Sequence, residues 1–169
     1  MLSAFAPSEP KDAEELQETL DELEFQLYRM QDNLKEIAKK YEVIGVDQPE
    51  ENELVIVSAQ NDGNECKIMI NNCHKAYKGV WDFAIHGVYE DDHTIHIGDI
   101  KGPVNKGYGS ICMNYLKEVA RDQNVHTIKG DIAKRDWDHV NRLVHFYEKH
   151  DFHVEIDYNN QCGEIEWTP

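Results

Sequence analysis

The sequence has few basic residues for its length and no long apolar run. Its 169 residues include 33 acidic against 17 basic side chains, which gives a formal net charge of -16. Because nucleic-acid binding needs a basic surface, this balance argues against a nucleic-acid partner. No stretch approaches the roughly 20 apolar residues of a membrane helix, and no N-terminal apolar run resembles a signal peptide. We therefore expect neither nucleic acid nor a membrane among the partners.

Cysteine is also scarce. The chain has four cysteines, with no short repeated spacing: Cys66, Cys73, Cys112 and Cys162. Such a set predicts neither a disulfide framework nor a cysteine-rich metal site. We therefore expect free thiols in a reducing compartment, and we predict a cytoplasmic protein.

Histidine, a frequent metal ligand, occurs nine times. The tightest groups are His93 with His96, and His145 with His150 and His153. Two ligands on one helix need a spacing of three or four residues, which His145 and His150 do not have. Because the cysteines supply no matching pair, the sequence predicts no metal site.

The excess of acidic residues has two interpretations, and both can hold at once. An acidic surface attracts a cationic ligand such as an amine, a polyamine or a basic protein segment. Acidic residues also keep a protein soluble without any specific partner. The composition therefore suits a cationic amine acceptor but does not identify one.

Shifts in composition divide the chain into three parts. Residues 1–10 are small, apolar and proline-containing without a period, so we predict a disordered tail there. We expect a long helix over residues 11–44 and a globular domain over residues 45–169. The stretch from Gly45 to Asn52 contains a proline and several acidic residues, and it is expected to be the linker between helix and domain.

A heptad pattern runs from Asp12 to Tyr41 without glycine or proline. Apolar residues recur at alternating spacings of four and three: Leu16, Leu20, Leu23, Leu27, Met30, Leu34, Ile37 and Tyr41. A period of about 3.5 residues predicts a long helix with a narrow apolar seam, as in a coiled coil. We therefore expect a homodimer formed through residues 16–41. The alternative is that the helix packs on its own domain, and Phe25 and Tyr28 widen the apolar stripe in that direction.

The remainder of the chain predicts an α+β fold. Runs of β-branched and alternating residues indicate strands at Leu54–Ser58, Glu65–Ile70, Val80–Tyr89, Thr94–Ile100, His126–Ile132, Asp151–Ile156 and Glu164–Trp167. Helical spacing indicates one helix over Ser110–Arg121 and another that begins near Asp136 and runs toward His150. An antiparallel meander followed by this alternation predicts a mixed, largely antiparallel sheet flanked by helices.

A glycine loop stands between the strand Thr94–Ile100 and the helix that follows it. The first N–H groups of a helix have no partner inside the helix, and the helix dipole makes that end positive. Gly107 and Gly109 let an anion approach the backbone, and Lys106 adds a full positive charge. The P-loop pattern is absent, and the third glycine of the dinucleotide fingerprint is missing. The loop therefore predicts an anion site outside those two classes.

Two segments resemble the GNAT acetyltransferase superfamily. The first is Val-Asn-Lys-Gly-Tyr-Gly over residues 104–109, where the superfamily carries Gln/Arg-x-x-Gly-x-Gly/Ala between a strand and a helix. The second is Asn141–Phe152, which is similar to the superfamily's Asn…Leu-Tyr-Glu-Lys-x-Gly-Phe segment. The order of strands also matches, and the resemblance covers about residues 54–167. The chain departs at Val104, where Gln or Arg is usual, and at Asp151, where glycine is usual.

This resemblance implies acetyl-CoA as co-substrate and N-acetylation of a primary amine as the reaction. It implies that the glycine loop holds the pyrophosphate through a continuous run of residues: Asn105, Lys106, Gly107, Tyr108, Gly109 and Ser110. The backbone at Ile100 and Lys101 would pair with the pantetheine arm. Tyr147 would protonate the departing thiolate, and Asn141 would contact the cofactor.

The sequence leaves the general base and the final function open. Acidic and imidazole groups near the central strand are the candidates: Asp99, Glu90, Asp91 and His96, with a water molecule as the alternative. We take Asp99, together with Tyr147, as the predicted catalytic pair. The competing hypothesis is a non-catalytic GNAT-like adaptor that self-associates through its long helix and binds CoA or a protein partner.

Overall fold

The computed structural model describes residues 12–169, so the predicted tail over residues 1–10 lies outside the described residues. The helices are α1 Ala13–Ile37, α2 Tyr108–Asp122 and α3 Val140–Lys149, with a 3-10 turn η1 Lys134–His139 directly before α3. The strands are β1 Glu42–Glu50, β2 Glu53–Asn61, β3 Glu65–Asn72, β4 Phe83–Asp91, β5 Thr94–Lys101, β6 Thr127–Ile132, β7 His153–Asp157 and β8 Cys162–Trp167. The predicted α+β class is confirmed.

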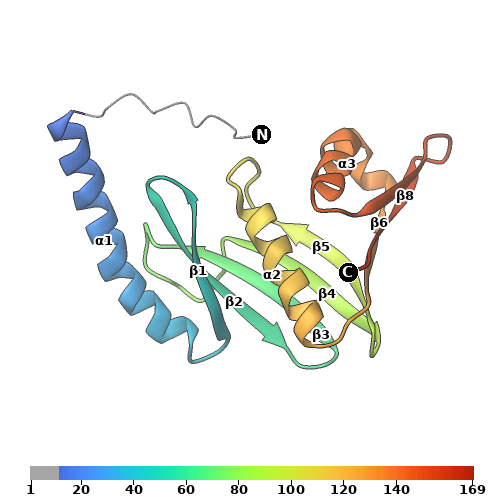
Figure 1. Cartoon of the computed structure of the whole chain (residues 1–169), viewed down its shortest axis with the longest axis horizontal. Coiled ribbons are helices and arrows are strands. Elements are labelled where there is room, and N and C mark those ends of the chain that lie inside the picture. The colour runs from blue at the N-terminus through green and yellow to red at the C-terminus, as the bar shows by residue number, and fades with distance from the viewer. Residues whose placement is uncertain (1–11) are drawn as a thin grey trace.

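One mixed sheet contains all of these strands, in the order β1-β2-β3-β4-β5-β6-β8-β7 (Figure 1). Neighbouring strands are antiparallel except β5 and β6, which run parallel and are connected through α2. A parallel pair needs a crossover of this kind, because the chain must return to the end of the sheet at which the first strand of the pair began. The sheet is therefore mixed and largely antiparallel, as predicted.

The main core lies between the sheet and α2. Val55 and Val57 on β2 face this side, and α2 contributes Cys112, Met113 and Leu116, all of them buried. Side chains alternate along a strand, so Ile56 between the two valines faces the opposite side of the sheet. There it packs in a second, smaller cluster with residues of α1. Helices thus cover both faces of the β2 region.

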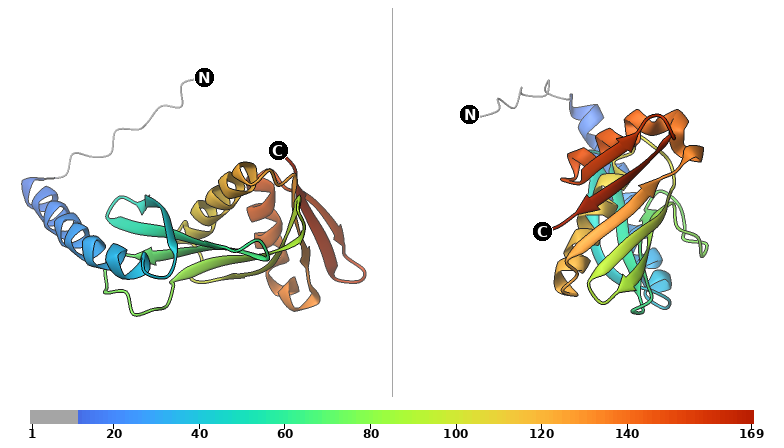
Figure 2. Two further views of the ribbon diagram at one scale, coloured as in Figure 1. Left: turned by 90° about the horizontal axis from the view of Figure 1, so that it is seen from below. Right: turned by 90° about the vertical axis from the view of Figure 1, so that its right-hand side faces the viewer.

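The long helix α1 begins at an N-cap, where Asp12 accepts a hydrogen bond from the Glu15 N–H at 2.8 Å. Its C-terminal half packs on its own sheet through Met30 and Ile37. The N-terminal half extends from one end of the molecule, and β6, β8 and α3 lie at the other end (Figure 2). The alternative of packing within the same chain therefore holds for the second half of α1.

The predicted linker from Gly45 to Asn52 is wrong, because most of it belongs to β1. A side chain at Gly45 would collide with the ring of Tyr115 on α2, so this glycine serves helix–sheet contact inside a strand. Pro49 is tolerated because β1 is an edge strand, where a missing N–H costs no sheet bond. Glycine and proline usually interrupt a helix or strand, whereas here each fits a specific place in an edge strand.

Candidate functional site

The parallel strands β5 and β6 separate part way along their length. Their last paired residues are Ile97 and Gly130, although β5 continues to Lys101. At the same level the β4–β5 register shifts, because Gly87 pairs with Ile97 and the next pair joins Asp99. Gly98 is thus the extra residue of a β-bulge, a feature that bends a strand and often accompanies functional sites. The divergence opens a cavity of about 310 Å³, here called the splay cleft.

Strands β5 and β6, the turn η1 and helix α3 supply the walls of the splay cleft. Three predicted site residues on β5 line it, namely Asp99, Ile100 and Lys101. The opposite side carries Asp131, Ile132, Arg135, Asp136, Leu143 and Tyr147. Beyond Ile97, β5 does not pair with β6, so this part of its edge faces the cleft. The structure therefore brings Tyr147 together with the β5 residues that the sequence singled out.

Tyr147 lies in the last turn of α3 and is almost fully buried. Its ring makes edge-to-face contacts with Phe146 and Phe152. Burial, with a smaller effect from the charge of Asp136, raises the pKa of Tyr147 to about 12. The phenol therefore keeps its proton at every pH at which the protein would act, and it can serve as a proton donor.

The glycine loop follows β5 directly and ends at the N-terminus of α2. Gly107 is the N-cap with a φ of 78°, and Asn105 has a φ of 60°, so the loop turns through left-handed backbone. Within residues 12–169, the first-turn N–H groups of Tyr108, Gly109 and Ser110 donate to no backbone or side-chain acceptor. Because such groups bind anions readily, the loop retains the property that its sequence predicted.

The side chains around this turn have further contacts that the sequence did not indicate. The Tyr108 hydroxyl donates to the buried Glu53, so only the Tyr108 backbone is left for a ligand. Gly109 lies against the Phe146 ring, which a Cβ atom would approach within 3.1 Å. The Ser110 hydroxyl lies 3.0 Å from His150 Nε2. The first turn of α2 is therefore partly covered by α3.

Of the predicted cofactor residues, only Ile100 and Lys101 line the splay cleft. Lys106 lines a separate cavity beside β1, β2 and α1. Asn141 is exposed near the start of α3 and does not line the cleft. The structure thus groups the β5 residues and Tyr147 at the cleft, and the loop residues at the N-terminus of α2.

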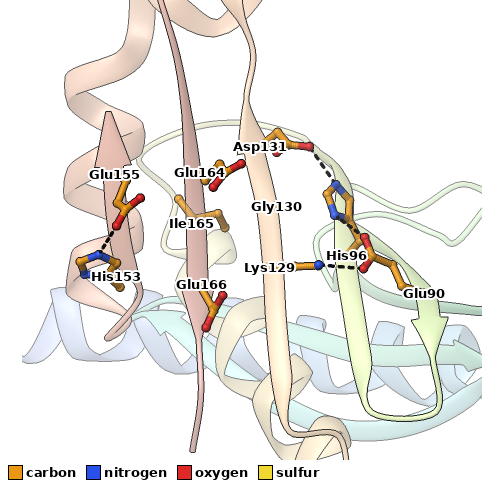
Figure 3. A pocket seen from close by; sticks show the side chains of 10 residues that line it. All are labelled: Glu90, His96, Lys129, Gly130, Asp131, His153, Glu155, Glu164, Ile165 and Glu166. Atoms are coloured by element: carbon orange, nitrogen blue, oxygen red, sulfur yellow. Dashed lines mark hydrogen bonds and ion pairs between the residues drawn. The ribbon is translucent and has the colours of Figure 1, made fainter. Parts of the chain in front are cut away.

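A second cavity, of about 530 Å³, lies on the open face of the sheet (Figure 3). We call it the acidic hollow because five carboxylates line it, those of Glu90, Asp131, Glu155, Glu164 and Glu166. His96, His153 and Lys129 also line it. Asp131 borders both the splay cleft and the acidic hollow, so the two cavities adjoin each other at this residue.

Sequence reasoning missed the β6 and η1 side of the cleft. Asp131, Arg135 and Asp136 carry charges into the cleft, yet none belongs to a recognisable motif. The available signal was positional, because Asp131 follows Gly130 at the end of a strand parallel to the predicted site strand. Gly98 carried a second signal, since an isolated glycine inside a strand often marks a bulge.

Neither a metal site nor a membrane-spanning helix is found among residues 12–169. Residues 12–169 contain no group of three or more His, Cys, Asp or Glu side chains that could hold a metal ion. Among the same residues, no helix is both long and apolar enough to cross a membrane.

The strand order, the single parallel pair and the helix that connects it define an α+β protein with a mixed, largely antiparallel sheet. No family model matches the chain. The chain is 55% identical over 158 residues to the Bacillus subtilis protein "Uncharacterized protein YocC", covering 94% of this chain and 95% of that protein. The chain therefore belongs to the same protein family as YocC.

Solved structures show a more distant likeness in fold. The N-acetyltransferase PseH of Campylobacter jejuni is 17% identical with a TM-score of 0.46, covering 63% of this chain and 70% of that chain. The spermidine N-acetyltransferase SpeG of Vibrio cholerae is 16% identical with a TM-score of 0.47, covering 63% and 66%. An aminoglycoside 6'-N-acetyltransferase of Enterococcus faecium is 10% identical with a TM-score of 0.42, covering 63% and 76%.

Proposed function

We propose that this protein is an N-acetyltransferase that moves the acetyl group of acetyl-CoA to a primary amine of a cationic acceptor. The observation that supports it most is the splay cleft, which places the buried phenol of Tyr147 opposite the free edge of β5. The unpaired N–H groups at the start of α2 lie at the end of the loop that leaves this edge.

These features suit the parts of acetyl-CoA in turn. The amides of Tyr108, Gly109 and Ser110 are donors for the pyrophosphate. The β5 edge at Ile100 and Lys101 offers backbone groups to the amide-rich pantetheine arm, as a strand offers them to a neighbouring strand. An arm that follows this edge brings its thioester into the cleft beside Tyr147.

The transfer then needs a donor for the departing sulfur and an acceptor for the amine proton. The amine nitrogen attacks the acetyl carbon, the carbon–sulfur bond breaks, and the Tyr147 hydroxyl gives its proton to the thiolate. The nitrogen loses two protons on the way from ammonium to amide. A carboxylate on the cleft rim takes the first before the attack, and the second, released as the carbon–sulfur bond breaks, restores the Tyr147 phenol. Asp99, the carboxylate expected from the sequence, is one group on that rim, and Asp131 is another.

The acidic hollow supports a cationic acceptor. It adjoins the cleft, and its five carboxylates face a single lysine, Lys129, which is already paired with Glu90 at 2.9 Å. A molecule with a second positive charge can therefore bind in the hollow while its reacting amine enters the cleft.

Calorimetry with acetyl-CoA and with CoA tests the donor site, and failure to bind at high micromolar concentration contradicts the proposal. Tyr147→Phe should lower kcat about 100-fold, because a positioned acid contributes roughly 10²–10⁴-fold, while the Kd for acetyl-CoA stays unchanged. Tyr158→Phe, which alters an exposed tyrosine, is the matched control. Wild-type turnover in Tyr147→Phe would remove this residue from the mechanism.

A non-catalytic adaptor is the second candidate, and the cover over the α2 N-terminus favours it. Phe146 lies against Gly109, and His150 contacts Ser110, so part of the anion site is occupied by the chain's own side chains. Binding of CoA without turnover across a panel of mono-, di- and polyamines would select this function.

A further inference from the structure

A partly buried imidazole in the acidic hollow contacts Asp131, the residue that borders both the hollow and the splay cleft. His96 lies on β5, one residue before the last pair between β5 and β6. Its Nε2 atom is 3.3 Å from Oδ2 of Asp131, and its Nδ1 atom is 3.1 Å from Oε1 of Glu90 (Figure 3). Lys129 holds the second oxygen of Glu90 at 2.9 Å. The contacts run from Asp131 on β6 through His96 on β5 to Glu90 on β4, and from Glu90 to Lys129 on β6.

The contact at Nδ1 brings a second carboxylate to the ring. Nδ1 is shielded from solvent, and its contact with Glu90 lies within ion-pair distance without the geometry of a hydrogen bond. Each ring nitrogen of His96 thus faces a carboxylate, Nε2 that of Asp131 and Nδ1 that of Glu90. A positive charge on the ring would be attracted by both.

Asp131 reaches the cleft from the side opposite Tyr147. On β6 the neighbours of Asp131, Gly130 and Ile132, are buried in the face that carries α2, so Asp131 itself faces the open side. Tyr147 belongs to the core cluster on the α2 side. A proton donor and a carboxylate thus flank the same cleft from its two faces.

We propose that Asp131 takes the proton from the acceptor ammonium and passes it to Nε2 of His96, an inference that rests on the proposed acetyl transfer. An N–H bond of the ammonium breaks, and the freed lone pair attacks the acetyl carbon. The proton moves through the Asp131 carboxylate and forms an N–H bond on His96. Glu90, fixed by Lys129, balances the imidazolium until the proton leaves through the acidic hollow. Asp131 is then the catalytic base and His96 a positioning residue that acts through it.

Other charged groups surround this chain of contacts. Glu164 and Glu166 from β8 and Glu155 from β7 line the hollow and add to its negative charge. His153 is drawn to Glu155 at 3.1 Å. The rival carboxylate, Asp99, forms an ion pair with Lys101 at 3.2 Å, so it would have to give up that pair to take a proton.

Steady-state kinetics at saturating acetyl-CoA across pH 5–9 test the assignment. Asp131→Asn should lower kcat about 100-fold or more, as expected for loss of a general base, with the calorimetric Kd for acetyl-CoA unchanged. Formate should restore part of the rate in Asp131→Ala, because it supplies the missing carboxylate. His96→Gln should lower kcat about 10-fold and change the pH dependence of kcat, because the imidazole is the group that receives the proton from Asp131. His145→Gln, an exposed histidine on α3 that lines neither cavity, should leave the pH profile unchanged.

Several results would overturn this proposal. Wild-type kcat in Asp131→Asn, or an unchanged pH profile in His96→Gln, removes Asp131 and His96 from the reaction while leaving the proposed function intact. A loss of rate confined to Asp99→Asn assigns the base to Asp99 instead. If the wild-type protein transfers acetyl to no amine, the proposed function fails and this inference fails with it. In the substrate-free protein, the His96 ring resonances in an NMR spectrum should move when Asp131 is replaced by Asn; resonances that stay in place contradict the contact.

Discussion

At the scale of single residues, His150 shows how burial fixes a protonation state. It ends α3, and its ring is 6% exposed between Ser110 and Phe146. Its backbone carbonyl accepts a hydrogen bond from Lys117, another buried residue. Burial, with a smaller contribution from the positive charge of Lys117, lowers the pKa of His150 from 6.5 to about 4. The folded protein therefore holds this histidine neutral.

This depressed pKa predicts a loss of stability in mild acid. Between about pH 6.5 and pH 4 the unfolded chain binds a proton at His150 that the folded chain does not, so the free energy of unfolding falls as pH falls. The loss between pH 7 and pH 5 should be about 2 kcal/mol. Urea unfolding at the two pH values should show a smaller difference in His150→Gln than in the wild type. His145→Gln, exposed on the same helix, should keep the wild-type difference, and an equal difference in all three proteins contradicts the assignment.

At the scale of elements, α1 is held to the sheet by two buried amides as well as by apolar contacts. Gln26 accepts a hydrogen bond from the Leu54 N–H at 2.8 Å and donates to the Asn52 carbonyl. Asn33 accepts one from the Tyr77 N–H at 2.8 Å and donates to the Lys75 carbonyl at 3.0 Å. Each amide therefore satisfies backbone groups of a strand end or loop that would otherwise lack partners.

Removing one of these amides tests that attachment. Asn33 is 2% exposed, so Asn33→Ala leaves the Tyr77 N–H and the Lys75 carbonyl without their partner. We expect a loss of about 2–3 kcal/mol in the free energy of unfolding, measured by urea denaturation. Asp32→Ala, exposed beside it, should change stability by less than about 0.5 kcal/mol. A similarly small change in Asn33→Ala would mean that α1 is held by its apolar contacts alone.

At the scale of the whole molecule, the apolar stripe on the outer half of α1 has no cover within the described residues. Leu20 is 60% exposed and Leu27 is 52% exposed, and Leu16 extends the same stripe. Apolar residues at coiled-coil spacing that remain exposed in the monomer favour pairing with a second copy. The homodimer expected from the sequence remains our proposal for this surface.

Sedimentation velocity tests this dimer directly. The wild-type chain should sediment as a dimer at micromolar concentration, and Leu20→Asp with Leu27→Asp should give a monomer, because charge in the seam removes the apolar contact. Gln31→Asp, which adds charge at an exposed polar position, should remain dimeric. A wild-type protein that sediments as a monomer contradicts the proposal.

The sequence by itself determined the α+β class, the order of strands and helices after Leu54 and the long helix, because these depend on local periodicity and on turn residues. It also placed the glycine loop at a helix N-terminus and selected Tyr147, since both lie in short continuous segments. Those predictions need only neighbours along the chain.

Only the tertiary structure decided which distant residues share the site. The divergence of β5 from β6 after Ile97 depends on a bulge and on pairing across the sheet. This divergence makes Asp131 a neighbour of the cleft, and Asp131 in turn contacts His96. Gly45 in the sequence likewise indicates an interruption, whereas in the structure it lies inside β1, where a side chain would collide with Tyr115 of α2. Contacts of this kind join residues far apart in sequence, so no local pattern encodes them.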